Sequence, residues 1–206
     1  MNSPATAPQK NSYHHGQLRE ALLATTLQLV QEKGVNDWSL RDVARQLGVS
    51  AAAPFRHFDS KQALLAAVAE QAMQQFAAAV AQGMQAGGDD PLRAMGQAYL
   101  RWAIAHPAAF HVISNRDVLN LAQQPGLLAQ SEAVMAQLEA LLQQRFGQQP
   151  GFVAQHARLA FRAQVYGLAR MAVDRHLEEW AIAPACYLDE CLAALDQFLL
   201  LLPGRA

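Results

Sequence analysis

The sequence of 206 residues is 52% hydrophobic and rich in alanine, leucine and glutamine, which favours one helical domain or a small helical domain followed by a larger one. No apolar run approaches the ~20 residues that span a bilayer, and the first twelve residues lack the apolar region of a signal peptide, so we expect a cytoplasmic protein with no membrane partner. The net charge of −1 combines seven Lys/Arg and five Asp/Glu in residues 1–62 with nine Lys/Arg and twelve Asp/Glu in residues 63–206, which indicates a polyanionic partner for the first part only.

The N-terminal segment shows no helical pattern before Gly16. Residues 1–12 are polar and contain two prolines, so we expect a disordered arm. Tyr13-His14-His15 favours a solvated stretch, with a phosphate contact as the alternative, and adjacent histidines without further ligands do not predict a metal site. From Gly16 to Lys33 apolar residues recur at three- and four-residue steps, which predicts an amphipathic helix that ends at Gly34.

Two short predicted helices follow, joined by a tight turn. Ser39 and Asp42 form a capping-box pattern, so we expect a helix from Leu40 that ends just before Gly48. The next helix is expected over residues 50–58, with its serine as the cap. This pair has the dimensions of a helix-turn-helix motif. The side chains expected to form its small core are Val43, Ala44, Leu47, Val49, Phe55 and Phe58.

The rest of the chain predicts longer helices. Asp59 and Gln62 form a second capping-box pattern, which opens a helix through about Met84. Glycine and proline clusters divide the following residues into apolar-periodic stretches, and no alternating pattern typical of strands occurs. We therefore expect an all-α fold of about nine helices. The remaining helices are expected over residues 91–105, 107–121, 126–146, 151–178 and 185–202.

The stretch from Tyr13 to Leu65, and especially its part LRDVARQLGVSAAAPFRHFDSKQALL, resembles the DNA-binding head of the tetracycline-repressor (TetR) family. The shared pattern is a short helix ending in leucine-glycine-valine-serine, an aromatic-rich recognition helix and a serine-lysine pair that opens a long helix. The resemblance implies a ligand-responsive regulator, mostly a repressor in this family, that binds a palindromic DNA operator as a homodimer. It also implies a helix-turn-helix domain over residues 13–62 and a ligand-sensing and dimerisation domain over residues 63–206.

The resemblance implies DNA contacts on the second and third helices and at the start of the fourth. Arg41 would contact a base or a phosphate, and Lys61 would hold a phosphate at the positive end of the fourth helix. Phe55 stands where the family usually has a tyrosine, so its contact is apolar or it packs in the core. Pro54 cannot donate a backbone hydrogen bond. For His57 a groove contact and a structural role are equally open. The expected DNA contacts are Arg41, Ser50, Ala51, Ala52, Ala53, Phe55, Arg56, His57 and Lys61.

The last two predicted helices carry wide apolar stripes. In the TetR family two such helices from each subunit form a four-helix dimer interface, and the alternative is packing within one subunit. Cys186 and Cys191 predict neither a disulfide framework nor a zinc site. The residues expected in the dimer interface are Val165, Ala169, Ala172, Leu188, Leu192, Leu195, Phe198 and Leu199.

Aromatic and arginine side chains of the central helices are candidates for an effector pocket. Ordinary core packing is the alternative for each aromatic residue. Arg162 or Arg170, if buried, needs an anionic partner, and the alternative is that these side chains extend to the surface. The stretch from Arg162 to Gly167 is also similar to a tryptophan-x-x-x-histidine-glycine motif of one TetR subgroup, of which only Gly167 matches. The pocket candidates are Tyr99, Trp102, His106, Phe110, Phe161, Arg162, Tyr166 and Arg170.

The sequence contains no nucleophile elbow, P-loop, dinucleotide fingerprint or metal-ligand cluster, so we expect no catalytic site, metal or cofactor. The alternative function is a helical enzyme or ligand carrier without DNA binding. Arg41, Arg56 and Lys61 on the helix-turn-helix favour DNA binding over that alternative. The expected partners are a double-stranded DNA operator, an unidentified small-molecule effector and a second copy of the chain.

Overall fold

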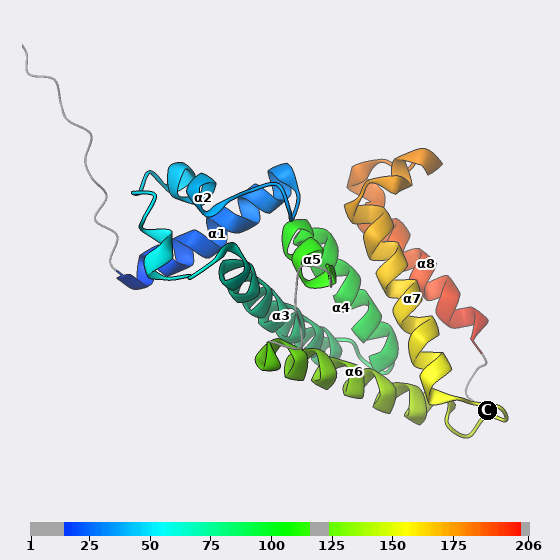
Figure 1. The fold of residues 1–206 in the computed structure, drawn as a ribbon. Coiled ribbons are helices and arrows are strands. Elements are labelled where there is room, and N and C mark those ends of the chain that lie inside the picture. Colours follow the sequence, from blue (N-terminus) through cyan, green and yellow to red (C-terminus); the bar gives the residue numbers. More distant parts are fainter. Residues whose placement is uncertain (1–14, 116–123, 203–206) are drawn as a thin grey trace, which may run out of the picture. The chain divides into compact units, whose positions relative to one another are not determined.

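The structure is a computed structural model that describes residues 15–115 and 124–202, and the chain divides into two compact units, Met1–Leu64 and Leu65–Ala206. In the described ranges it contains eight α-helices, three short 3-10 helices and no strand, which confirms the all-α class (Figure 1). None of the helices in these ranges is long and apolar enough to cross a membrane. The arm expected over residues 1–12 lies outside the described residues.

The first unit packs its short helices around an aliphatic and aromatic core. Leu22, Leu29, Trp38, Val43 and Phe58 are all buried there. Helix α1 ends as the sequence predicts, because Gly34 has a φ of +85° and its N–H donates to the Val30 carbonyl at 2.9 Å. The elements of this unit are α1 (His15–Lys33), α2 (Leu40–Leu47), the 3-10 helix η1 (Pro54–Arg56) and the beginning of α3 (Lys61–Ala86).

Both ends of α2 are defined by the residues that flank it. The Ser39 hydroxyl accepts a hydrogen bond from the Asp42 N–H at 3.2 Å, and the Asp42 carboxylate accepts from the Ser39 N–H at 2.9 Å. This confirms the predicted capping box. The Ser39 hydroxyl also donates to the Asp42 carboxylate at 2.6 Å, and this bond is the main cause of the lowered pKa of Asp42. Gly48 ends the helix in the left-handed conformation, with φ +67°.

The α-helix predicted over residues 50–58 is wrong in type. The Ala53 N–H donates to the Ser50 carbonyl at 2.9 Å, but Pro54 has no N–H to make the next bond. The backbone therefore continues as η1, in which the Arg56 N–H donates to Ala53, three residues back. Its N-cap is Ala53 rather than Ser50. This difference accounts for eight α-helices among the described residues where the sequence predicts nine.

The N-cap of helix α3 lies one residue later than the sequence predicts. Its first residue is Lys61, so Ser60 is the N-cap, and the Ser60 hydroxyl accepts from the Ala63 N–H at 3.0 Å. The sequence predicts this role for Asp59. The helix continues to Ala86, two residues beyond the predicted end, and so belongs to both units.

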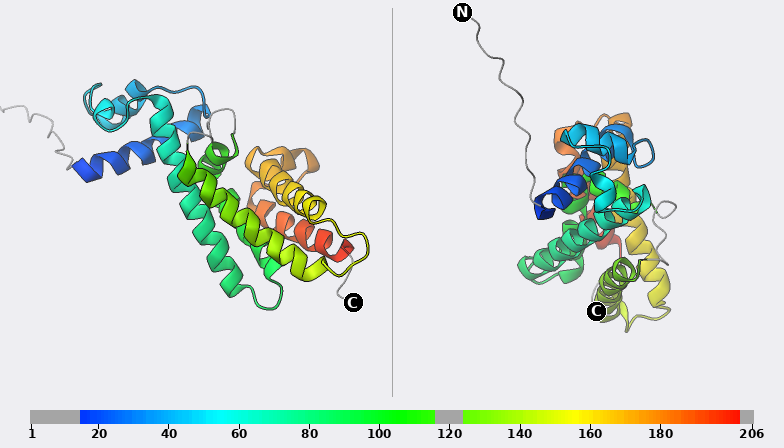
Figure 2. Two further views of the ribbon diagram at one scale, coloured as in Figure 1. Left: turned by 60° about the horizontal axis from the view of Figure 1, so that its bottom comes forward. Right: turned by 60° about the vertical axis from the view of Figure 1, so that its left-hand side comes forward.

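The second unit is built around one central helix. Its helices are α4 (Pro91–Ala105), α5 (Pro107–Ser114), α6 (Pro125–Phe146), α7 (Ala154–Val173) and α8 (Tyr187–Leu201), together with the C-terminal part of α3. Helix α4 packs against α6, α7 and α8, and α7 and α8 lie side by side (Figures 1 and 2). A Cβ at Gly96 would lie 2.8 Å from Leu195 Cδ2 and 3.1 Å from Phe161 Cζ. The missing side chain at Gly96 therefore lets α4 approach both neighbours closely.

The predicted helix over residues 151–178 is too long at both ends. Gly151 has a φ of +77°, and α7 begins only at Ala154. At the other end Arg175 adopts a left-handed conformation, with φ 63°, and its Nε donates to the Glu178 carboxylate at 2.7 Å. A 3-10 helix, η3, follows over His176–Trp180, and a second, η4, over Pro184–Cys186 precedes α8. Helix α5 ends at Ser114, and the end predicted near residue 121 lies outside the described residues.

Candidate functional site

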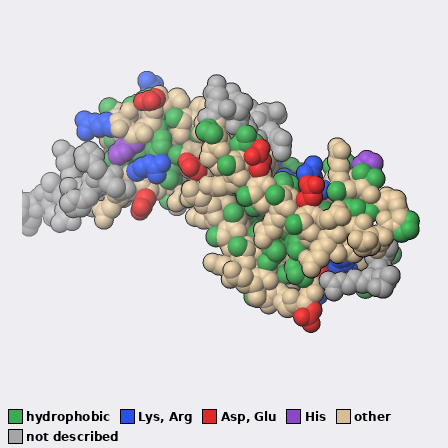
Figure 3. Space-filling view, turned by 90° about the horizontal axis from the view of Figure 1, so that it is seen from below, with side chains coloured by type: hydrophobic (Ala, Val, Ile, Leu, Met, Phe, Trp, Pro, Cys, Tyr) green, Lys and Arg blue, Asp and Glu red, His purple; other side chains and the backbone are tan. Residues whose placement is uncertain are grey.

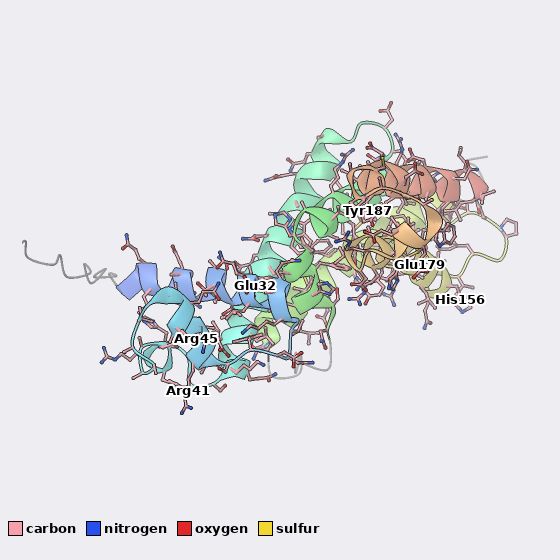
Figure 4. All side chains as sticks on the ribbon, turned by 90° about the horizontal axis from the view of Figure 1, so that it is seen from above. Glu32, Arg41, Arg45, His156, Glu179 and Tyr187 are labelled. Carbon is pink, nitrogen blue, oxygen red and sulfur yellow. The ribbon has the colours of Figure 1, made fainter. Side chains whose placement is uncertain are left out.

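The outer face of α2 presents two arginines. Leu40, Val43 and Ala44 occupy the buried face of the helix, which places Arg41 and Arg45 on the exposed side (Figure 4). Arg45 forms an ion pair with Asp42 on the same helix, so part of its charge is compensated. Arg41 is exposed to solvent, and Figure 3 shows Lys and Arg side chains on the surface of the first unit.

The segment between α2 and α3 exposes some of the expected contact residues and buries others. Ser50, Ala51, Ala52 and Arg56 are exposed, and His57 is partly buried. Ala53 is buried, so we reassign it from the DNA-contact surface to the core of the first unit.

Phe55 does not belong to the core in which the sequence placed it. Its side chain is 51% exposed, although Pro54 beside it is buried. The packing alternative for Phe55 is therefore wrong, and an unusually large apolar group stands next to Arg56 on the surface. Such a ring suits an apolar contact, for example with a thymine methyl group in a major groove.

Lys61 is held in place at the N-terminus of α3. Its Nζ donates to the Asn36 carbonyl at 2.7 Å and lies 4.6 Å from the centroid of the Trp38 ring. Partial burial is the main cause of the lowered pKa of Lys61. An ammonium carries three N–H donors, so the bond to Asn36 leaves donors for an anion at the positive end of the helix.

Arg19 is a basic residue of this surface that sequence reasoning missed. It is exposed on α1, and its guanidinium lies 5.5 Å from the centroid of the Phe58 ring. Phe58 lies two residues after the end of η1, so Arg19 is close to the expected contact residues. Nothing in the spacing of α1 distinguishes Arg19 from an ordinary solvated arginine, because the contact depends on how α1 packs.

Four of the eight pocket candidates surround two small cavities in the second unit. Tyr99 and Arg162 line both cavities, Phe110 lines the first and Phe161 the second. The cavity volumes are about 50 Å³ and about 20 Å³. Phe76 also lines both, and it packs edge-on against Tyr99 with ring centroids 5.2 Å apart. The sequence did not single out Phe76, since an aromatic residue within a long apolar helix resembles ordinary core.

Three other pocket candidates lie elsewhere. Trp102 and His106 stack on each other, with ring centroids 5.3 Å apart, and line an open groove along α3 and α4. Tyr166 packs against Phe110, with ring centroids 5.9 Å apart. Trp102 and His106 are thus separate from the two cavities, while Tyr166 contacts Phe110, which lines the first cavity.

Arg170, the last candidate, has a structural role. Its guanidinium pairs with Asp174 at 2.6 Å and lies 3.2 Å from the Nδ1 of His111. His111 Nε2 in turn lies 3.5 Å from the Asp174 carboxylate, and burial is the main cause of the lowered pKa of His111. The cluster connects α5 to α7, and it satisfies the charge of Arg170 without a ligand.

Five of the eight residues expected in the dimer interface are buried by their own subunit. They lie on the faces of α7 and α8 that pack within the second unit, so we reassign them from the interface to its core. Leu188, Leu192 and Phe198 remain partly exposed. The five buried residues are Val165, Ala169, Ala172, Leu195 and Leu199.

Two family models match this chain. Residues 22–68 match the model described as "Bacterial regulatory proteins, tetR family", and residues 92–195 match the "Tetracyclin repressor-like, C-terminal domain". Together they span the helix-turn-helix and most of the second unit. A search of curated proteins found no match.

Several solved structures share the fold over nearly the whole chain. A protein of unknown function from Rhodococcus sp. RHA1 is 31% identical over 92% of this chain and 97% of its own, with a TM-score of 0.71. A putative tetR family transcription regulator from Shewanella sp. PV-4 is 25% identical, covering 86% and 95% of the two chains, with a TM-score of 0.61. The TetR family regulator PfmR from Thermus thermophilus is similar in fold, at 24% identity, coverages of 88% and 98% and a TM-score of 0.66.

Proposed function

Because the chain belongs to the tetracycline-repressor (TetR) family of bacterial transcriptional regulators, we propose that it is a repressor that binds a palindromic operator as a homodimer and is released by a small-molecule effector. Members of this family are DNA-binding proteins with a helix-turn-helix, and they are not enzymes. We also propose that the protein is cytoplasmic, because a repressor must reach its DNA operator. The observation that carries the proposal is the exposed surface of the helix-turn-helix, where Arg41, Phe55 and Arg56 are open to solvent.

We assign three kinds of DNA contact to this surface. Arg41 and Arg56 would read bases, because a guanidinium can donate two hydrogen bonds to one guanine. Lys61 would hold a phosphate, since its ammonium is fixed at the N-terminus of α3 by Asn36 and Trp38. Phe55, Ala51 and Ala52 would add apolar contacts, and Ser50 and His57 would complete the surface.

The first prediction separates base reading from phosphate binding. Arg56→Ala should weaken operator binding by about 1–3 kcal/mol and relax the preference at one base position. Lys61→Ala should weaken binding about equally on all sequences and lower the salt dependence of the affinity by about one unit of slope. The measurement is a titration of DNA selected by the unmodified protein from a random library, repeated at several salt concentrations.

Arg158→Ala is the matched control for this prediction, because Arg158 lies in the second unit and pairs with Glu139. It should leave both affinity and salt slope unchanged. Melting curves verify that Lys61→Ala is folded, since the substitution also removes the contact with Trp38. An Arg56→Ala protein with its sequence preference intact would contradict the base-reading role. A complete lack of DNA binding by the unmodified protein would favour a ligand carrier instead.

The second prediction concerns the effector. Helix α3 carries Lys61 at its start and the cavity residues Met73 and Phe76 further along, so a ligand that shifts this helix would also act on the DNA contact. Coupling between two sites is reciprocal and is typically worth about 1–3 kcal/mol. We expect operator DNA to weaken effector binding by about 5- to 150-fold, and by the same factor as the effector weakens DNA binding. Calorimetric titration of a compound that raises the melting temperature, with and without operator, measures this factor. Equal effector affinity in both titrations would show that the second unit is not a sensor.

A further inference from the structure

Arg162 lines three separate hollows of the second unit. Arg162 lines the two inner cavities and also an open groove between α6 and α7. Met135 lines all three hollows as well, and Ser131 lines the groove and the larger cavity. This arrangement gives Arg162 an apolar interior on one side and access to solvent on the other.

No ion pair joins Arg162 to an acid among the described residues, and the acids that line the same open groove are Glu132 and Glu139. Several other arginines of this unit have an acidic partner, and Arg158, one helical turn earlier on α7, pairs with Glu139 at 2.9 Å. None of the ion pairs found within residues 15–115 and 124–202 involves Arg162, whose guanidinium instead lies 5.8 Å from the centroid of the Tyr166 ring. A partly buried guanidinium next to apolar cavities gains most from an anionic partner.

The cavity walls add apolar surface and further hydrogen-bond donors. Phe76, Phe110 and Met73 provide apolar contacts, and the Tyr99 phenol borders both cavities. Burial is the main cause that raises the pKa of Tyr99 to about 12, so its hydroxyl stays protonated at neutral pH and can donate to an anion. Ser131 adds a second hydroxyl. The cavity lining thus combines one guanidinium and two hydroxyls with apolar side chains.

We propose that the effector is an amphipathic organic anion whose carboxylate pairs with Arg162 and whose apolar part enters between Phe76 and Phe110. This inference rests on the proposed function, in which the second unit senses an effector. Ligand pockets usually measure about 300–1,000 Å³, so the cavities must expand when the ligand enters. Met73 and Met135 allow such expansion, because methionine side chains have three flexible torsions and no branch.

The test compares carboxylates with alcohols of the same shape. The probes are octanoate against 1-octanol and 4-phenylbutyrate against 4-phenyl-1-butanol, each titrated calorimetrically into the full-length protein. Hydrogen bonds to charged groups imply that at least one carboxylate binds about 10- to 100-fold more tightly than its alcohol. Arg162→Gln should abolish this preference, and Arg162→Lys should keep part of it. Arg158→Gln, the control on the same helix, should leave it unchanged.

Three results would overturn the inference: both alcohols bind as tightly as their carboxylates, none of the probes binds, or Arg162→Gln retains the preference. If Arg162→Gln does not fold, Arg162→Lys is used in its place. The site is then supported if Arg162→Lys prefers the carboxylate less than the unmodified protein does, while Arg158→Gln keeps the full preference. DNA binding by the ligand-free protein is measured separately. Its absence, together with a preserved carboxylate preference, would reject the repressor function and keep the anion site, whereas the reverse pattern would reject the anion site alone.

Discussion

Leu195→Glu should leave the second unit unfolded rather than yield a folded monomer. The Leu195 side chain is 0% exposed and lies close to Gly96, at the contact between α4 and α8. Glutamate at this position would bury a charge without a partner, which costs several kcal/mol beyond the lost packing of the leucine. Because the free energy of unfolding of natural domains is only about 5–15 kcal/mol, one such substitution removes most of it.

Circular dichroism at increasing temperature measures this effect, and Leu200→Glu is the matched control. Leu200 is on the same helix, five residues further on, and its side chain is 77% exposed. The Leu200→Glu protein should keep its helical signal and a cooperative transition, whereas Leu195→Glu should show neither. A cooperative transition for Leu195→Glu near that of the unmodified protein would mean that α8 does not pack on α4 through this residue.

Local signals in the sequence predict the first unit well where one or two neighbouring residues decide the structure. The Ser39–Asp42 capping box and the glycines at 34 and 48 specify helix ends without help from distant residues. Pro54 shows the limit of such reasoning. Its missing N–H is evident from the sequence, yet the pattern predicts an α-helix over residues 50–58, and the structure has a 3-10 helix there, with Ala53 and Phe58 buried.

The second unit depends more on tertiary structure, and there several predictions are wrong. A helical apolar stripe shows that a face is buried but not which surface buries it, so Ala169 and Leu195 are predicted in a dimer interface and instead form the core. No glycine or proline marks the end of α7 at Val173. The residue that adopts the left-handed conformation after this helix is Arg175, which the sequence does not single out. Likewise Phe76 becomes a cavity residue only when α3 meets α4.

The dimer that we propose must use surface that the subunit leaves exposed. Leu200 and Leu201 at the end of α8 are each 77% exposed. Large apolar side chains in such positions indicate a surface that another protein covers. Helices α7 and α8 lie side by side, so their outer faces would pack against the same faces of a second copy around a two-fold axis. We therefore assign the interface to these outer faces, with Leu188, Leu192 and Phe198 at their edges.

Leu200→Glu combined with Leu201→Glu should give a folded monomer that no longer holds its operator. A two-fold dimer presents its recognition segments about 34–36 Å apart, so that both enter successive major grooves of a palindromic site. A monomer reaches only one half-site and loses most of the specific binding, which usually exceeds non-specific binding by about 10³-fold or more. Light scattering measures the mass, and titration of selected DNA measures the affinity.

Leu128→Glu, which adds a charge to an exposed leucine of α6, should remain a dimer with unchanged affinity. A double variant that still scatters as a dimer would place the interface elsewhere, and a folded monomer with full operator affinity would show that dimerisation is not needed for DNA recognition.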